Sequence, residues 1–385
     1  MVDARLESGA AAPSPTVARQ VRVALVSNAP APYRVPALRL LAQCPDIALE
    51  VVYCAPPHID TSLSAADHGF EPRFLGGRYV ALDRRFLHAD WRVIGLLRRL
   101  DPQVVITCGF IPTFLAAFAW ARLTHRAHVV FIDGTLQSES SLSAAHRAIR
   151  RFVFAHTAAF VGASEGSSAL FSAYGVQQAR IFKAPLAVDN ARFQLHPQPE
   201  RTVDLLFSGR LIAHKSPVFA LEVAAGVARR LGRRVSIDFL GTGELLQELQ
   251  ARALALNPWV QARFLGHLAQ AELPDHYARA KVFLFPTRMD TWGVVANEAA
   301  AAGLPIVVSA HAGVAGELVR DGEEGRILPL DLPTWTEAVA TLLSDASLRR
   351  RMADAARTAV SAYTFEAAAS TLRLAILHAS GHADS

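Results

Sequence analysis

Short runs of apolar, often β-branched residues recur along the chain, separated by stretches whose apolar residues have helical spacing. The first tract predicts strands over 21–28, 48–54, 103–107, 128–132 and 159–161, with a helix over 36–43. The second tract predicts strands from 203 onwards and over 235–240, 262–265, 281–285 and 305–309, alternating with helices over 218–231, 244–256, 272–280 and 294–302. Strands that alternate with helices indicate an α/β fold with parallel sheets.

The two tracts predict two doubly wound domains, one over 21–190 and one over 203–364. The stretch 191–202 is polar and contains prolines, which is typical of a linker. We expect residues 1–20 to be a disordered tail and residues 365–378 to form a helix that packs back on the first domain. Because such sheets bind ligands at the carboxyl ends of their strands, the predicted binding site is a cleft between the domains.

Composition excludes a mostly disordered chain, because 51% of the 385 residues are hydrophobic and only 19% are charged. The formal net charge of +5 suits anionic ligands or an anionic membrane surface. The excess is too small to indicate nucleic acid, and no nucleic-acid recognition module is visible, so nucleic acid is not an expected partner.

Targeting and redox signals point to a cytoplasmic protein. Cys44, Cys54 and Cys108 are widely spaced and form no CxxC pair, so neither a disulfide framework nor a zinc site is expected. Residues 1–20 contain acids and no apolar core, which is unlike a signal peptide. Residues 104–121 are uncharged and long enough to span a bilayer, but Gly109 and Pro112 favour a buried strand, a turn and a buried helix.

The segment 286–309 has the strongest chemical signal. A buried strand is followed by a loop with Asp290, and a helix then begins near Val294 and carries Glu298. Two carboxylates placed in this way can hold the hydroxyls of a sugar or a ribose, and the start of the helix favours an anion. The alternative is a helix-capping acid and a solvated glutamate.

This segment resembles the E-x7-E signature of retaining glycosyltransferases of family 4, which have the GT-B fold of two Rossmann-like domains facing a central cleft. The matching residues are Asp290, Trp292, Gly293, Glu298, Ala299, Gly303 and Pro305, with aspartate at the first acidic position where the family usually has glutamate. The resemblance implies that Asp290 contacts the donor sugar and that Glu298 holds the nucleotide ribose. It also places Thr291, Trp292, Gly293 and Val294 at the donor.

The stretch Ser208 to Ser216, SGRLIAHKS, resembles the GRLxxxKG motif of the same family. Gly209, Arg210 and Lys215 would lie at the carboxyl end of a strand, where two cations can neutralise the charge that grows on a departing diphosphate. The sequence has no DxD triad to bridge a metal ion. We therefore expect metal-independent transfer and no cofactor, the nucleotide-sugar being a substrate.

Other motifs are weaker. Gly241 and Gly243 lack the third glycine of a dinucleotide fingerprint, and the resemblance places them beside the nucleotide, with His267 near the base. The first tract has SNAPAPYRVP in place of the family's Gly-Gly loop and is similar to a PYRVP-bearing subgroup. Tyr33 and Arg34 are there candidates for acceptor or phosphate contacts.

Asp133 stands where the family commonly has a histidine that touches the donor sugar. It could accept a hydrogen bond from a sugar hydroxyl or cap the following turn, and both interpretations are open. Glu139 and Glu165 are nearby acids without a motif, and we interpret them as surface residues. Basic stretches at 84–100 and 146–156 mix arginine with aromatic residues; they are predicted to be helices that either lie on an anionic membrane or pack on the sheet.

Taken with the resemblance, these features predict an enzyme that moves a sugar from a nucleotide-sugar donor to a carbohydrate or lipid-linked acceptor in cell-envelope assembly. The expected location is the cytoplasm, including the inner face of the membrane. A glycosyltransferase that tailors a small natural product is the main alternative. From a different class, an inactive nucleotide-sugar or glycan-binding protein would also explain the departures at Asp133 and Asp290 and the missing Gly-Gly loop.

Overall fold

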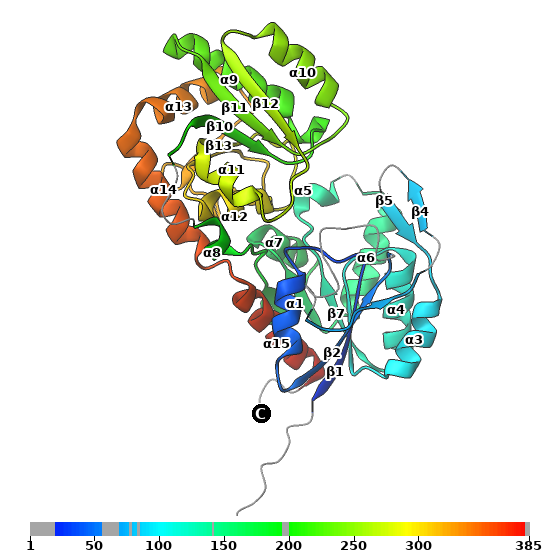
Figure 1. Cartoon of the computed structure of the whole chain (residues 1–385). Helices are drawn as coiled ribbons and strands as arrows, with labels where there is room; N and C mark the ends of the chain where they lie inside the picture. The colour runs from blue at the N-terminus through cyan, green and yellow to red at the C-terminus, as the bar shows by residue number, and fades with distance from the viewer. Residues whose placement is uncertain are drawn as a thin grey trace, which may run out of the picture.

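Two separate parallel sheets organise the chain, one in each half of the sequence (Figure 1). The computed structural model describes residues 20–55, 69–76, 79–82, 85–140, 142–194 and 200–381. In strand order, the first sheet consists of β3 (Arg73–Phe74), β2 (Ile47–Tyr53), β1 (Val21–Ser27), β6 (Val104–Thr107), β7 (Ala127–Phe131), β8 (Ala159–Gly162) and β9 (Ile181–Lys183).

Both faces of the first sheet are buried, which explains why its strands read as continuous apolar runs. Alternate strand residues such as Val23 and Leu25 face α1 (Val35–Ala42) and α15 (Phe365–Ser380). Those between them, such as Ala24 and Val26, face the opposite layer. That layer contains α3 (Arg92–Leu100), α4 (Pro112–Leu123), α6 (Ala144–Ala155) and α7 (Glu165–Ala173).

The second sheet repeats this design. In strand order it consists of β12 (Val260–Gly266), β11 (Val235–Leu240), β10 (Val203–Ser208), β13 (Ala280–Phe285), β14 (Ile306–Ser309) and β15 (Gly325–Leu328). One face is covered by α9 (Pro217–Leu231), α10 (Leu246–Ala255) and α13 (Leu332–Ser344), and the other by α11 (Leu273–Arg279), α12 (Val294–Ala301) and the end of α14 (Ala346–Val360). The expected α/β fold with two doubly wound domains is thus confirmed.

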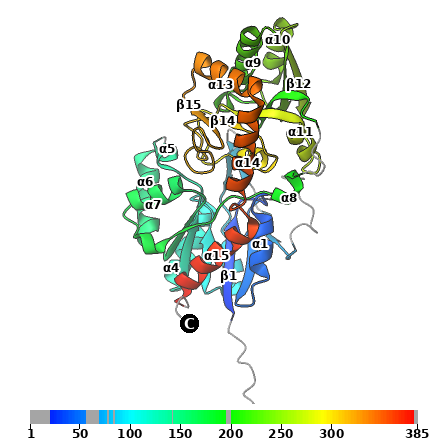
Figure 2. The same cartoon turned by 90° about the vertical axis from the view of Figure 1, so that its left-hand side faces the viewer.

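The chain passes between the two halves twice. It leaves the first sheet through α8 (Asn190–Phe193) and returns after α14, so that α15 lies beside α1 (Figures 1 and 2). Leu372 and Ile376 of α15 are buried in the core of the first sheet. Arg373 adds an ion pair to Asp46 at 2.6 Å. The first half is therefore built from both ends of the sequence.

Residues 104–121 form β6 and most of the buried helix α4, with a turn between them. Among the described residues, no helix combines the length and the apolar character that crossing a membrane requires. The stretch 146–156 lies largely within α6, as predicted.

The single helix expected over 84–100 is wrong. Residues Arg85–His88 form strand β5, which pairs with β4 (Tyr79–Leu82) in an antiparallel hairpin, and α3 begins only at Arg92. Asp90 explains the break. Its carboxylate accepts a hydrogen bond from the backbone N–H of Arg92 at 3.0 Å, and its own N–H donates to the Thr113 hydroxyl at 2.9 Å. These bonds hold the loop that precedes α3, whose N-cap residue is Trp91.

Candidate active site

Glycine residues allow the loops that follow β10, β11 and β12 to approach one another closely. The N–H of Gly241 donates to the carbonyl of Gly266 at 2.7 Å. Gly241 has φ of +124°, and a Cβ there would lie 2.1 Å from the carbonyl oxygen of Gly209. A Cβ on Gly243 would lie 2.3 Å from the carbonyl oxygen of Leu211. Only glycine fits these two positions, so both predicted glycines are required by the close approach of neighbouring loops.

The loop after β10 presents the two predicted cations. Arg210 is exposed and forms no ion pair with any described residue. Lys215 is largely buried and forms an ion pair with Asp290, and its ammonium lies 5.8 Å from the centre of the Phe285 ring. The carbonyl of His214 accepts a hydrogen bond from the backbone N–H of Arg288 at 2.7 Å. This bond ties the cationic loop to the loop that carries Asp290.

Backbone N–H groups, in addition to Lys215, contact Asp290. One carboxylate oxygen accepts a hydrogen bond from the N–H of Trp292 at 3.2 Å, and the other pairs with Lys215. Its carbonyl accepts from the N–H of Gly313 at 2.9 Å. Asp290 lines a cavity of about 350 Å³ that also contains Thr135 from the first domain. Asp290 therefore lies at the boundary between the domains.

Gly293 lets the chain turn from that loop into α12. Its φ is +108°, and a Cβ there would lie 2.3 Å from the Phe285 ring. No side chain caps the helix, and the N–H of Ala296 donates to the carbonyl of Gly293 at 2.8 Å, so the backbone N–H groups of Val294 and Val295 remain available to an anion. Trp292 behaves differently from the expectation of a donor contact. Its indole is buried and donates to Asn297 at 2.8 Å, so only its backbone can face a ligand.

Glu298 lies one turn further along α12 and is 7% exposed. The hydroxyl of Tyr277 on α11 donates to its carboxylate at 2.5 Å. Burial raises the pKa of Glu298 to about 7, although the hydrogen bond from Tyr277 acts in the opposite direction. A buried acid with a pKa near neutrality, facing a cavity, is typical of a functional site.

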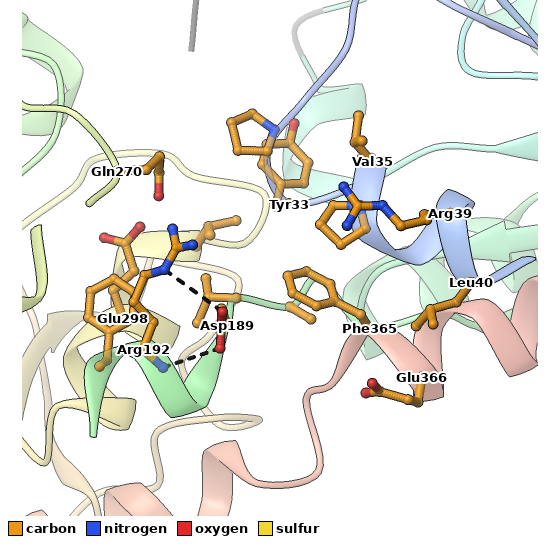
Figure 3. A pocket seen from close by; sticks show the side chains of 16 residues that line it. Tyr33, Val35, Arg39, Leu40, Asp189, Arg192, Gln270, Glu298, Phe365 and Glu366 are labelled. Carbon is orange, nitrogen blue, oxygen red and sulfur yellow. Dashed lines mark hydrogen bonds and ion pairs between the residues drawn. The ribbon is translucent and has the colours of Figure 1, made fainter. Parts of the chain in front are cut away.

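The cavity that Glu298 lines has a volume of about 690 Å³ and lies between the two halves (Figure 3). Val294 and Gln270 belong to the second half, and Tyr33 to the first. The ring of Tyr33 also packs against the core of the second half. Burial raises the pKa of Tyr33, the Arg34 guanidinium lowers it, and the carboxylates of Asp133 and Asp290 raise it.

Arg34 and Asp133 form an ion pair at 2.5 Å on the first-domain side. The guanidinium also lies 4.2 Å from the centre of the Phe131 ring. Burial lowers the pKa of Arg34, yet the net shift is upward because Asp133 favours the charged form. Its Nε and one Asp133 oxygen are buried without a partner among the described residues. Asp133 does not act as a helix cap, because Thr135 caps the helix α5 (Leu136–Glu139).

Three residues without a motif join the two domains. Glu317 of the second half accepts from Lys183 of β9 at 3.1 Å and from the backbone N–H of Glu165 at 2.9 Å. The Lys183 ammonium also donates to the Glu165 carboxylate at 2.7 Å. Glu165 is thus part of a contact between domains. Glu139, in contrast with the expectation of a surface residue, is buried and accepts from Tyr174 at 2.7 Å.

The structure therefore brings most predicted site residues to one region. Arg210, Lys215, Asp290 and Glu298 lie on loops and a helix that follow the strands at the centre of the second sheet, and Tyr33, Arg34 and Asp133 follow strands of the first. Thr291 is half-buried, and a Cβ on Gly313 would lie 2.0 Å from its carbonyl. His267 is exposed after β12. No cluster of three metal-ligating side chains occurs within the described ranges.

Comparison with known families agrees with this geometry. The model described as "Glycosyltransferase Family 4" matches residues 37–192, and the one described as "Glycosyl transferases group 1" matches residues 189–359. Together they cover both domains. The chain belongs to the group 1 glycosyltransferases.

Individual proteins support the same family. Over 187 residues, this glycosyltransferase chain is 32% identical to "Glycogen synthase" of Mycobacterium tuberculosis, a match that covers 48% of this chain and 45% of the relative. It is 31% identical over 221 residues to "D-inositol 3-phosphate glycosyltransferase" of Kineococcus radiotolerans, covering 49% and 50%. The chain spans about half the length of the curated relatives it matches.

Solved structures show that the fold is GT-B. Anabaena Alr3699/HepE in complex with UDP superposes with a TM-score of 0.73 at 15% identity, covering 92% of this chain and 98% of that one. The pneumococcal O-GlcNAc transferase GtfA in complex with UDP and GlcNAc gives a TM-score of 0.72 at 11% identity, covering 94% and 99%. The PYRVP-bearing subgroup stays a prediction.

Proposed function

We propose that this protein transfers a sugar from a nucleotide-sugar donor to a hydroxyl of an acceptor, with retention of the anomeric configuration. One observation carries the proposal: Lys215, Asp290 and Glu298 lie on neighbouring elements at the carboxyl edge of the second sheet. Lys215 and Asp290 are in contact with each other. A cation for a phosphate, an acid for a sugar and a buried acid for a ribose are the three parts that such a donor needs.

The proposed reaction breaks the bond between the anomeric carbon and a phosphate oxygen, and that oxygen keeps the electron pair. A new bond forms between the same carbon and the acceptor oxygen, whose proton is released with the nucleoside diphosphate. Arg210 and Lys215 would stabilise the growing negative charge without a metal ion, together with the free N–H groups at the start of α12. Asp290 would hold the sugar.

The acceptor would bind on the first domain, where Arg34 follows β1 and pairs with Asp133, which follows β7. We expect a carbohydrate or a lipid-linked acceptor, with a role in cell-envelope assembly. The exposed side chains of Ile149 and Phe152 on α6, with Arg147 and Arg151 nearby on the same helix, form a surface that suits anionic lipid. Binding to vesicles of anionic lipid that weakens with salt would support a membrane location. Equal binding to neutral vesicles, or none to either, would contradict it.

The decisive experiment first identifies the donor by its binding and then measures sugar transfer from that donor. A thermal-shift screen of nucleoside diphosphates and their sugars identifies the donor, because a ligand that binds only the folded state raises the melting temperature. The stabilising donor is then incubated with acceptor candidates, with and without EDTA, and the products are analysed by mass spectrometry and NMR. Transfer with a retained anomer in EDTA is expected. Binding without transfer or slow donor hydrolysis would favour the inactive binding protein.

A further inference from the structure

Tyr277 and Glu298 form the one hydrogen bond recorded for the Glu298 side chain within the described residues. Tyr277 lies on α11, and its hydroxyl donates to Oε2 of Glu298 on α12 at 2.5 Å. Tyr277 is fully buried and Glu298 is 7% exposed. The bond is therefore shielded from water and is of the short, charge-assisted kind when the carboxylate is ionised.

The position of the Tyr277 ring is fixed by three elements. Phe193 of α8 packs edge to face against it, with the ring centres 5.4 Å apart. Phe283 of β13 lies at 5.9 Å on another side. The hydroxyl also has a side-chain hydrogen bond with Ser208 at the end of β10. A ring held in this way cannot turn its hydroxyl away from Glu298 without disturbing the core.

The hydrogen bond from Tyr277 involves only one of the two Glu298 carboxylate oxygens. Oε2 accepts the hydrogen bond from Tyr277, whereas no hydrogen bond to Oε1 occurs among the described residues, and the Glu298 side chain lines the 690 Å³ cavity. Figure 3 shows the Glu298 carboxylate on the cavity wall, with Gln270 on the same side. Oε1 is thus the oxygen that a ligand can reach.

We propose that Tyr277 is a positioning residue that fixes the Glu298 carboxylate so that its free oxygen accepts hydrogen bonds from the ribose hydroxyls of the donor. This inference rests on the proposed function, because it takes Glu298 as the ribose-binding acid. Tyr277 acts through Glu298 and does not touch the nucleotide. A phenylalanine at 277 would keep the packing but release the carboxylate.

The hydrogen bond also affects protonation. Burial raises the pKa of Glu298, and Tyr277 lowers it by stabilising the charged form, so removal of the hydroxyl raises the pKa further. The other titratable or charged side chains on the walls of the same cavity are Tyr33, Arg39, Asp189, Arg192 and Glu366. If nucleotide binding needs the charged carboxylate, binding strengthens as the pH rises through the pKa of Glu298.

The test compares Tyr277→Phe with Tyr174→Phe. Tyr174 is half-buried and serves as the control, because its hydroxyl donates at 2.7 Å to Glu139, a 7% exposed acid of the first domain that also pairs with Arg150. The probe is the tightest binder among ADP, CDP, GDP and UDP, measured by calorimetry from pH 5.5 to 8.5. For Tyr277→Phe we expect about tenfold weaker binding at pH 7, a binding midpoint at higher pH, and a smaller effect on kcat. Tyr174→Phe should leave both binding quantities unchanged.

A double variant distinguishes the positioning role of Tyr277 from the ribose-binding role of Glu298. In a Glu298→Gln background, Tyr277→Phe should weaken binding no further, because its effect passes through the carboxylate. Unchanged affinity and an unchanged pH midpoint in folded Tyr277→Phe would overturn the positioning role. Equal losses in both backgrounds would also overturn it. If Glu298→Gln itself binds the probe as tightly as the wild type, the ribose assignment in the proposed function fails instead.

Discussion

Lys215 and Asp290 form an ion pair between two loops whose contacting residues are 75 positions apart in the sequence. Both side chains are largely buried, with 16% and 19% of their surfaces exposed. A phosphate that binds Lys215 would compete with Asp290 for the same ammonium. Under the proposed function, the pair would couple the site for the leaving group to the site for the sugar.

Replacing Lys215 by alanine should lower turnover at least tenfold, equivalent to about 1.4 kcal/mol of transition-state stabilisation. Arg210→Ala should do the same, because both cations are proposed to act on the leaving group. The control is Lys281→Ala, which removes a lysine of the same domain that pairs with Asp204 at 2.9 Å outside the site. Steady-state kinetics at saturating donor provide the measurement. Full turnover in the Lys215 and Arg210 variants would reject the leaving-group role.

Asp290→Asn should depress kcat more than the affinity for nucleoside diphosphate. The proposed contact of Asp290 is with the sugar, whose geometry and charge change during transfer, so its loss acts on the rate. Asp290→Glu would restore the residue usual in the family and shows whether the shorter side chain is adapted to this site. Kinetics and calorimetry on the same preparations distinguish the effects. A loss of diphosphate affinity with kcat unchanged would assign Asp290 to the nucleotide.

Glu298→Gln should stabilise the folded protein more at pH 8 than at pH 5. The pKa of Glu298 is about 7 in the folded protein against 4.5 for the free side chain. The unfolded chain therefore loses its proton first, and the stability contributed by the protonated acid is present below pH 4.5 and is lost as the pH rises to about 7. Glutamine does not titrate and has no such loss. The unfolding free energy of Glu298→Gln minus that of the wild type should therefore increase by roughly 2–3 kcal/mol from pH 5 to pH 8.

Chemical denaturation of both proteins at each pH measures this difference. A constant difference across the range would mean that Glu298 is not the buried acid described above.

Arg34→Ala and Asp133→Asn should have non-additive effects on kcat/KM. The two side chains form an ion pair at 2.5 Å, so either substitution disturbs the same unit, and coupling energies of about 0.5–3 kcal/mol are typical of residues in contact. A double-variant cycle measures the coupling. Strictly additive losses would instead favour Arg34 as an independent contact to phosphate or acceptor.

Ser216→Gly should raise the unfolding free energy by about 1 kcal/mol with little change in turnover. Ser216 follows Lys215 where the resembled motif has glycine, and its φ of +53° costs a residue with a side chain about 1–2 kcal/mol. Its hydroxyl is buried without a partner among the described residues, which adds a further cost. Ser216→Ala separates the two terms, because it removes the hydroxyl but keeps the strained backbone. A lower melting temperature for Ser216→Gly would contradict this account.

Local sequence patterns predicted those parts of the site that are close together in the chain. Asp290, Gly293 and Glu298 fall within one loop and the start of one helix, and Arg210 and Lys215 fall within one loop. The family resemblance places Gly241 and Gly243 beside the nucleotide, and the structure shows that both positions need glycine. The single helix predicted over 84–100 is wrong, because residues 85–88 pair in a hairpin and the hydrogen bonds of Asp90 hold the loop that follows it.

Residues that act through long-range contacts carried no such signal. Tyr277 is 21 positions from Glu298, and Glu317 is 134 positions from Lys183. Each looks like an ordinary core or surface residue until the sheets bring the pairs together. Trp292 matched a motif, but only the structure shows that its indole faces the core.

By itself, the sequence determined the α/β class, the two doubly wound halves and the motifs at the strand ends, because hydrophobic periodicity and glycine requirements are local properties. Tertiary structure alone decided which charges pair. Arg34 meets Asp133 across 99 positions and Lys215 meets Asp290 across 75. Strand order places these loops side by side, and strand order depends on packing between distant segments. The protonation of Glu298 is likewise a tertiary property, because burial of the carboxylate, which no local pattern encodes, raises its pKa.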